Sequence, residues 1–175
     1  MFPLERASRS APTLFPSLEY RMARSAWDYA LNLLSARAYT TRNLRRKLVQ
    51  KEFAANEIES ALARLAQSGL LDDRKFGAEY ARQKVVGGGA SIRRVKQELA
   101  RKGIEPRAID DAVAELLVEE TIDQDAGIER LALRKLATLS DADDATRRRR
   151  VFGFLARKGY ELDDIKRVLS RVLQS

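Results

Sequence analysis

The sequence predicts an all-α protein in which three tandem three-helix repeats form an elongated, curved array. Three observations indicate this fold class: one apolar pattern occurs three times, each copy has the spacing of a helix face, and helix-capping residues stand between the copies. Ala, Leu, Arg, Lys and Glu dominate the 175 residues, and no segment of useful length has the alternation of a strand.

The repeated pattern lies across the turn between the second and third helices of each repeat. It starts with Leu and Lys three positions apart, continues with an aromatic or aliphatic residue and an Ile, and ends with apolar residues at helix-face spacing. The copies start 51 and then 56 residues apart, which is about the length of three short helices with their turns. The first copy comprises Leu48, Lys51, Phe53, Ile58, Ala61, Leu62 and Leu65, the second Leu99, Lys102, Ile104, Ile109, Ala112, Val113 and Leu116, and the third Leu155, Lys158, Tyr160, Ile165, Val168, Leu169 and Val172.

The turn inside each copy carries its own signals. In the second and third copies, Gly103 and Gly159 stand where a glycine can adopt the left-handed geometry that ends a helix. Glu52 occupies this position in the first copy, so the sequence does not predict the conformation of the turn there. Pro106 suits the first turn of the helix that follows. An apolar residue four positions before each initial Leu indicates a middle helix ahead of the turn: Leu44, Val95 and Val151.

A further helix is expected to open each repeat, which gives nine helices. Its apolar stripe comprises Trp27, Leu31 and Leu34 in the first repeat, Phe76 and Tyr80 in the second, and Ile128, Leu131 and Ala132 in the third. Aromatic residues on such stripes are expected in the core rather than stacked on nucleic-acid bases. The predicted caps of the middle helices are Thr40 or Thr41, then Ser91, then Ser140 or Asp141.

The repeats set the predicted domain boundaries. Residues 1–22 contain three of the four prolines and no sustained periodicity, so they are expected to be a mobile basic tail. The three repeats are expected at residues 23–69, 70–118 and 119–175. A chain of this length can form one ordinary domain or a short array of units that share a continuous core, and the repeats favour the array.

Composition narrows the possible functions. The chain has no Cys and no His, which removes thiolate chemistry, disulfides and the commonest general base. Gly87, Gly88 and Gly89 lack the Lys and Ser or Thr of a phosphate-binding loop. We therefore expect no enzyme activity, no cofactor and no bound metal. No apolar run approaches the ~20 residues of a membrane span and no secretory signal is present, so we expect a cytoplasmic protein.

A net charge of +8 and a pI near 10.0 point to a polyanionic partner. Basic residues recur at the start of each middle helix, with a lysine at its end, so stacked repeats are expected to align them in a basic stripe. A solvated face is the alternative, but the arginine run of the third repeat opposes the helix dipole and favours binding. The basic stripe comprises Arg42, Arg45, Arg46, Lys47, Lys51, Arg93, Arg94, Lys96, Lys102, Arg147, Arg148, Arg149, Arg150 and Lys158.

Four adjacent acidic pairs are the feature a metal-dependent nuclease would need to bring together. They do not fall at equivalent repeat positions, and most lie near predicted helix starts, where carboxylates stabilise a helix. A structural role is therefore favoured over a catalytic one. The pairs are Asp72 with Asp73, Asp110 with Asp111, Asp143 with Asp144, and Asp163 with Asp164.

Ordered motifs give a resemblance to a known family. The motifs are Arg37-x-Tyr39-Thr40-x-x-x-Leu44-x-x-Lys47-Leu48, then Gly69-Leu70-Leu71-Asp72-Asp73-x-x-Phe76-x-x-x-Tyr80-x-x-x-Lys84, then Gly89-x-x-Ile92 and Leu99-x-x-Lys102-Gly103-Ile104. This combination resembles the RecX family over about residues 25–173. The chain departs from the family at Gly77, where Ala is common, and at Glu52, and its tail has no counterpart.

The resemblance implies a non-enzymatic regulator that lies in the helical groove of the RecA filament on single-stranded DNA. Such proteins lower ATP hydrolysis, strand exchange and co-protease activity, and thereby act in DNA recombination, DNA repair and the SOS response. The implied partners are the RecA filament and single-stranded DNA, with double-stranded DNA as a further candidate, and the protein is expected to be a monomer. The alternative is a nucleic-acid-binding helical module that acts without RecA. No individual binding residue is carried over from the family.

Overall fold

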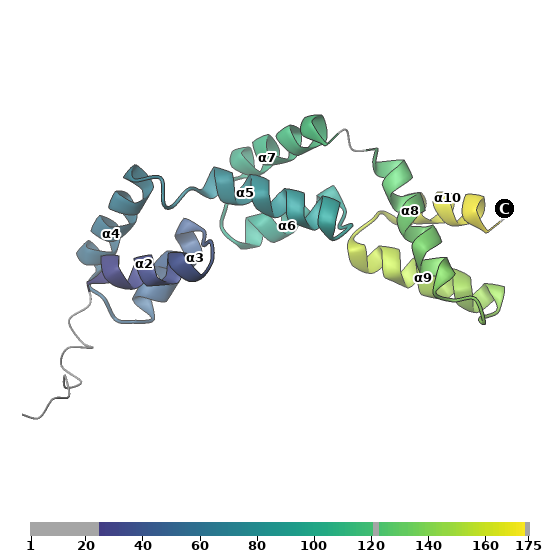
Figure 1. The fold of residues 1–175 in the computed structure, drawn as a ribbon, viewed down its shortest axis with the longest axis horizontal. Coiled ribbons are helices and arrows are strands. Elements are labelled where there is room, and N and C mark those ends of the chain that lie inside the picture. Colours follow the sequence, from purple (N-terminus) through teal and green to yellow (C-terminus); the bar gives the residue numbers. More distant parts are fainter. Residues whose placement is uncertain (1–24, 121–122, 174–175) are drawn as a thin grey trace, which may run out of the picture.

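The computed structural model describes residues 25–120 and 123–173, so the expected tail at 1–22 lies outside the described residues. Within them the chain forms nine α-helices and one π-helical turn in an elongated, curved array (Figure 1), which confirms the predicted fold class. The first repeat contains α2 (Ala26–Ala36), α3 (Thr41–Val49) and α4 (Ala55–Gln67). The second contains α5 (Asp73–Arg82), the π-helical turn η1 (Gln83–Gly87), α6 (Ile92–Arg101) and α7 (Pro106–Glu119), and the third α8 (Gln124–Ala137), α9 (Asp144–Lys158) and α10 (Leu162–Val172).

Hydroxyl side chains cap the middle helices of the first two repeats, as predicted. The Thr40 hydroxyl accepts a hydrogen bond from the Asn43 N–H, and the Ser91 hydroxyl accepts one from the Arg94 N–H, each over 3.2 Å. Each bond satisfies one N–H group that the first turn of a helix would otherwise leave unpaired. Both hydroxyls therefore fix where α3 and α6 begin.

The third middle helix begins differently, and the prediction of Ser140 or Asp141 as its cap was wrong. The Asp143 carboxylate caps α9 by accepting a hydrogen bond from the Thr146 N–H over 2.8 Å. Hydrogen bonds from Thr146 hold the pKa of Asp143 below its ordinary value. Arg147 is the residue of the third repeat that corresponds to Thr40 and Ser91. Because the stronger cap Asp143 precedes it by four residues, α9 starts one turn earlier than α3 and α6 do in their repeats.

The turns after the middle helices confirm the glycine prediction. Gly103 and Gly159 have φ angles of 86° and 92°, in the left-handed region, and Pro106 occupies the first turn of α7. Glu52 also adopts the left-handed region, with φ 62°. The first repeat therefore keeps the same turn without the residue that fits it best.

Replacing Glu52 by glycine should stabilise the protein. A left-handed backbone costs a residue with a Cβ about 1–2 kcal/mol, and glycine avoids this cost. Glycine also gives the unfolded chain more conformational entropy, which offsets about 0.5–1 kcal/mol of the gain. We expect a net gain of roughly 0.5–1 kcal/mol and a midpoint a few degrees higher in thermal unfolding followed by circular dichroism. Gln50→Gly, two positions earlier at φ −63°, should lower the midpoint. Lower midpoints for both variants would contradict the strain at Glu52.

The apolar side chains form three separate clusters, one in each repeat, which contradicts the continuous core expected for the array. The predicted aromatic residues pack against the edges of these clusters and are partly buried. Each repeat thus has its own core, although apolar side chains also line the grooves between repeats. The largest fully buried apolar side chains are Leu44, Leu48 and Leu65 in the first repeat, Val95 and Leu99 in the second, and Ile128, Val151, Leu155, Ile165, Val168 and Leu169 in the third.

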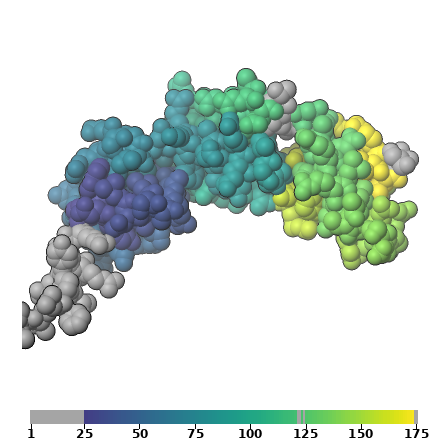
Figure 2. Space-filling model, in the orientation of Figure 1, coloured from purple at the N-terminus to yellow at the C-terminus, as the bar shows by residue number. Residues whose placement is uncertain are grey.

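The three repeats follow one another end to end (Figure 2), and we call the two places where they meet the first joint and the second joint. In the first joint the Thr40 hydroxyl donates to the Lys102 carbonyl over 2.8 Å, and the stem of Arg42 lies over Gly103. In the second joint the Ser91 hydroxyl donates to the Gly159 carbonyl over 2.7 Å. In both joints, the start of one middle helix therefore meets the turn that ends the next one.

Candidate nucleic-acid interface

Two basic residues of the predicted stripe form the same ion pair in successive repeats. Arg45 pairs with Glu59, and Lys96 pairs with Asp110 over 2.7 Å. Each pair links a middle helix to the third helix of its own repeat. Exposed pairs of this kind contribute about 0–1 kcal/mol, so they leave the cations open to exchange their partner for a phosphate. The recurrence shows that the two cations point in the same direction relative to their repeats.

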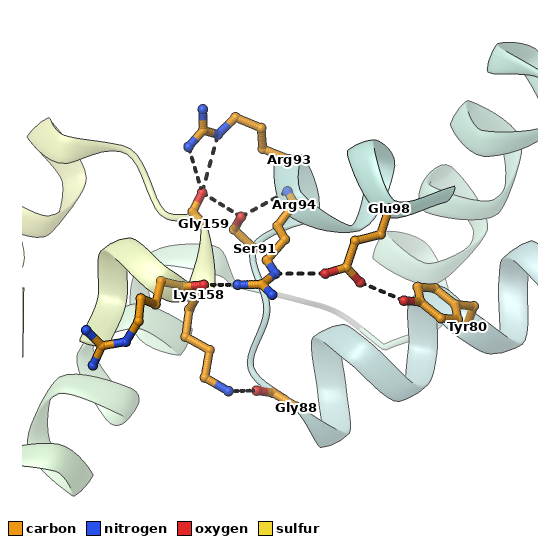
Figure 3. Close-up of polar contacts among 9 residues, drawn as sticks. Tyr80, Gly88, Ser91, Arg93, Arg94, Glu98, Lys158 and Gly159 are labelled. Atoms are coloured by element: carbon orange, nitrogen blue, oxygen red, sulfur yellow. Dashed lines mark hydrogen bonds and ion pairs between the residues drawn. The ribbon is translucent and has the colours of Figure 1, made fainter. Parts of the chain in front are cut away.

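Arg93 and Arg94 instead hold the second joint together (Figure 3). Arg93 donates from Nε and Nη2 to the Gly159 carbonyl over 3.3 and 3.2 Å, and it pairs with Glu161 over 2.8 Å. Arg94 donates to the Arg157 carbonyl and pairs with Glu98 over 2.8 Å. These two arginines therefore reach into the next repeat, which sequence spacing alone did not indicate.

Two consecutive hydrogen bonds, through Glu98 to Tyr80, hold the Arg94 side chain in place (Figure 3). The Tyr80 hydroxyl donates to the Glu98 carboxylate over 2.6 Å, and Glu98 in turn accepts from Arg94. Burial and the bond to Glu98 raise the pKa of Tyr80 to about 12, while hydrogen bonds from Tyr80 and Arg94 lower the pKa of Glu98. Near neutral pH Glu98 is therefore ionised and Tyr80 keeps its proton, so both hydrogen bonds stay intact.

The lysines that end the middle helices lie over aromatic rings. The Lys102 Nζ lies 4.9 Å from the ring centre of Tyr80, and the Lys158 Nζ lies 5.6 Å from that of Phe154. Lys158 also donates to the Gly88 carbonyl across the second joint. The Lys51 Nζ lies 5.8 Å from the ring centre of Tyr29 in the first repeat. Cation–π contacts of about 0.5–1 kcal/mol give these lysines a structural role besides any contact with a ligand.

The remaining residues of the basic stripe have fewer partners. Arg147 pairs with Asp144 over 3.4 Å, and its Nε is buried without a hydrogen-bond partner. Within residues 25–120 and 123–173, the others make no hydrogen bond or ion pair through their side chains: Arg42, Arg46, Lys47, Arg148, Arg149 and Arg150. Arg148, Arg149 and Arg150 thus form the largest run of free cations among the predicted residues. Because α9 begins at Asp144, they lie in its second turn and not at its start, so the predicted conflict with the helix dipole is weaker than expected. Whether the basic stripe binds DNA stays a prediction.

A second group of cations lies in a groove of about 950 Å³ between the second and third repeats, which we call the basic groove. Arg130, Arg134 and Lys135 line it from α8, and Lys158 lines it from the end of α9. None of the three α8 cations was predicted, because they belong to an opening helix rather than to the middle helix where the repeat places its arginines. Their spacing along one helix face was the signal that could have indicated them.

A groove of about 850 Å³ between the first and second repeats has the opposite character. It is lined by apolar side chains of α2 and α5 and by the carboxylates of Asp72, Glu79, Glu115 and Glu119. Lys75 and Arg82 also line it, and Arg82 pairs with Glu119. The two grooves between repeats thus differ in charge, and only the basic groove suits a polyanion.

The acidic pairs have structural partners. The Asp72 carboxylate caps α5, and Asp73 accepts from the Thr41 N–H over 2.8 Å across the first joint. Asp163 and Asp164 pair with cations in the next turn of α10. In the described part of the chain, no group of three acidic side chains gathers where it could hold a metal ion.

Among the helices of residues 25–120 and 123–173, none is long and apolar enough to span a membrane.

Comparison with known proteins identifies the three repeats. Models of the first, second and third three-helix domains of RecX match residues 26–65, 72–113 and 123–169. The regulatory protein RecX of Trichlorobacter lovleyi is 38% identical over 146 residues, covering 81% of this chain and 92% of that protein, and RecX of Pelodictyon phaeoclathratiforme is 33% identical over 84% of this chain and 88% of that protein. The crystal structure of RecX from Lactobacillus salivarius has a similar fold, with a TM-score of 0.67 at 21% identity over 86% of this chain and 96% of that one.

Proposed function

Because this chain belongs to the RecX family, we propose that it binds the RecA filament on single-stranded DNA and lowers the filament's ATPase, strand-exchange and co-protease activities. The curated relatives are named regulatory proteins, which supports a role in regulation rather than catalysis. On this proposal the protein acts as a cytoplasmic monomer in recombination, DNA repair and the SOS response.

The observation that carries the proposal is the elongated array with free arginines on its third repeat. Three bodies joined end to end extend much further than one compact domain of the same length, so the chain can contact more than one protomer of a helical filament. Arg148, Arg149 and Arg150 are exposed in the second turn of α9, where they are available to DNA phosphates or to acidic protein surface.

Replacing Arg148, Arg149 and Arg150 together by alanine should weaken inhibition of RecA. Three exposed ion pairs of about 0.5 kcal/mol each sum to about 1.5 kcal/mol, so the midpoint of inhibition should rise on the order of tenfold. The assay titrates the protein into RecA that hydrolyses ATP on single-stranded DNA. Arg147 is left in place because its Nε is buried and its guanidinium pairs with Asp144.

A variant with the same loss of charge elsewhere serves as the control: Arg74→Ala, Arg101→Ala and Arg107→Ala, all exposed. It should inhibit nearly as well as the parent. Unchanged inhibition by the Arg148 to Arg150 variant would remove these arginines from the interface, and no inhibition by the parent protein would refute the proposal itself.

A nucleic-acid-binding module that acts without RecA is the second candidate, and the net charge of +8 favours it. Such a module would bind bare DNA with a steep salt dependence and would gain no affinity when RecA coats the strand. Measuring affinity for bare and for RecA-coated single strands at several salt concentrations separates the two candidates.

A further inference from the structure

We propose that the basic groove binds a single strand of nucleic acid, with its cations on the phosphates and its apolar side chains against the bases. This inference rests on the proposed function for its partner, single-stranded DNA, but it adds a site outside the predicted basic stripe, apart from Lys158. The groove has two walls. The second repeat contributes η1 and the glycines that follow it, and the third contributes α8 and the end of α9.

The charges in the groove are unbalanced in favour of an anion. Both acidic residues that line it are already engaged, because Glu120 pairs with Arg82 over 3.3 Å and the Asp123 carboxylate caps α8. On the α8 wall, the side chains of Arg134 and Lys135 make no hydrogen bond or ion pair with any described residue. Cations without carboxylate partners on a concave surface attract phosphate groups.

Helix stability accounts for two of the three α8 cations but not for Arg130. Arg134 and Lys135 lie in the last turn of α8, where positive charge is favourable to the helix dipole. Arg130 lies a full turn earlier, and its Nε reaches only the Ala126 carbonyl of its own helix at 3.4 Å. Like charges four positions apart, as in Arg130 and Arg134, destabilise a helix by about 0.2–0.5 kcal/mol. A ligand that neutralises both would remove this repulsion.

Apolar side chains from both walls also line the groove and suit unpaired bases. Val86 is 54% exposed there, and Ile92, Leu131 and Phe154 also line the groove. An anion alone would not need apolar side chains in the groove, whereas single strands bind where cations follow the backbone and apolar or aromatic side chains contact the bases. A volume of about 950 Å³ is that of a drug-sized site, enough for roughly two nucleotides. In a duplex the bases are paired and stacked, so their faces cannot reach these side chains.

The two walls are held in place by the second joint. Lys158 lines the groove and also donates to the Gly88 carbonyl on the opposite wall, and Tyr160 donates to the Gly89 carbonyl over 3.4 Å. A strand in the groove therefore contacts both repeats at once. Its binding should fix the angle between them and so couple DNA contact to the curvature of the array.

The test uses the full chain and a short fluorescent oligothymidylate, with fluorescence anisotropy measured at several salt concentrations and without RecA. The groove variant is Arg130→Gln, Arg134→Gln and Lys135→Gln, which removes three charges and keeps polar side chains of similar helix propensity. The control, Arg74→Gln, Arg101→Gln and Arg107→Gln, removes the same charge outside the groove. Circular dichroism checks that both variants keep their helix content.

We expect the groove variant to lose at least about tenfold in affinity and to reduce the log-log salt slope by about 2, since each phosphate contact on a single strand contributes about 0.7. The control should lose less than about threefold and keep its slope. Equal losses in the two variants would mean that binding depends only on overall charge and would overturn the inference. So would an unchanged affinity of the groove variant.

A parallel titration into RecA separates this inference from the proposed function. If the parent protein binds oligothymidylate through the groove but does not inhibit RecA, the proposed function fails and the groove stands. If the groove variant binds oligothymidylate normally but no longer inhibits RecA, the groove contacts protein, and the inference of a nucleic-acid site is overturned.

Discussion

Replacing Leu155 by alanine should unfold the third repeat while the first two repeats stay folded. Leu155 is fully buried in the cluster of the third repeat, and truncation of such a leucine costs about 2–5 kcal/mol. Because each repeat has its own core, little of this loss can pass to its neighbours. Hydrogen exchange should then show lost protection in α8, α9 and α10 and retained protection in α2 through α7.

Leu133 provides the matched control, since it lies in α8 of the same repeat but is 50% exposed. Leu133→Ala should change stability by less than about 0.5 kcal/mol and leave the exchange pattern unchanged. Simultaneous loss of protection in all three repeats of Leu155→Ala would show that the chain unfolds as one cooperative unit, and it would contradict the independence of the three cores.

Replacing Gly159 by alanine should open the second joint without unfolding a repeat. Its φ of 92° costs a residue with a Cβ about 1–2 kcal/mol. The added Cβ would also lie 2.6 Å from the Cβ of Arg94 and 2.7 Å from the Ser91 Oγ, so the two repeats must move apart. We expect the bond between Ser91 and the Gly159 carbonyl to be lost and the angle between the repeats to vary.

Small-angle scattering measures this change as a wider distribution of overall dimensions, while circular dichroism should show nearly unchanged helix content. Gly127→Ala is the control, because Gly127 is helical and a Cβ there meets no atom within 4 Å. That variant should keep the dimensions of the parent and gain about 0.5–1 kcal/mol in stability. Identical scattering from Gly159→Ala and the parent would show that the joint tolerates the extra atom.

Local sequence signals were sufficient for much of the fold. The left-handed glycines, the caps at Thr40 and Ser91, and the apolar faces follow from residues less than two helical turns apart, and the structure confirms them. The cap of α9 was missed because Ser140 and Asp141 precede a stronger candidate, and a sequence of short polar residues does not reveal which one the helix will use.

The candidate site was less accessible to sequence reasoning because it depends on contacts between distant residues. Arg93 was predicted from its position at a helix start, but its partner is a carbonyl 66 residues away that only the joint brings near. The cations of the basic groove were missed for a similar reason. Arg130 and Arg134 lie on an opening helix whose register the repeat did not fix, and only the placement of two repeats makes a concave surface of them.

Thr40 and Ser91 are the two polar residues whose side chains are buried within the described ranges. Each hydroxyl uses its lone pair to start a helix of one repeat and its hydrogen to bind the end of a helix in the next. One atom thus determines both a local secondary structure and the direction in which the chain continues. Substitutions at these two positions can therefore change the overall bend of the array while the separate core of each repeat, and so its stability, is preserved.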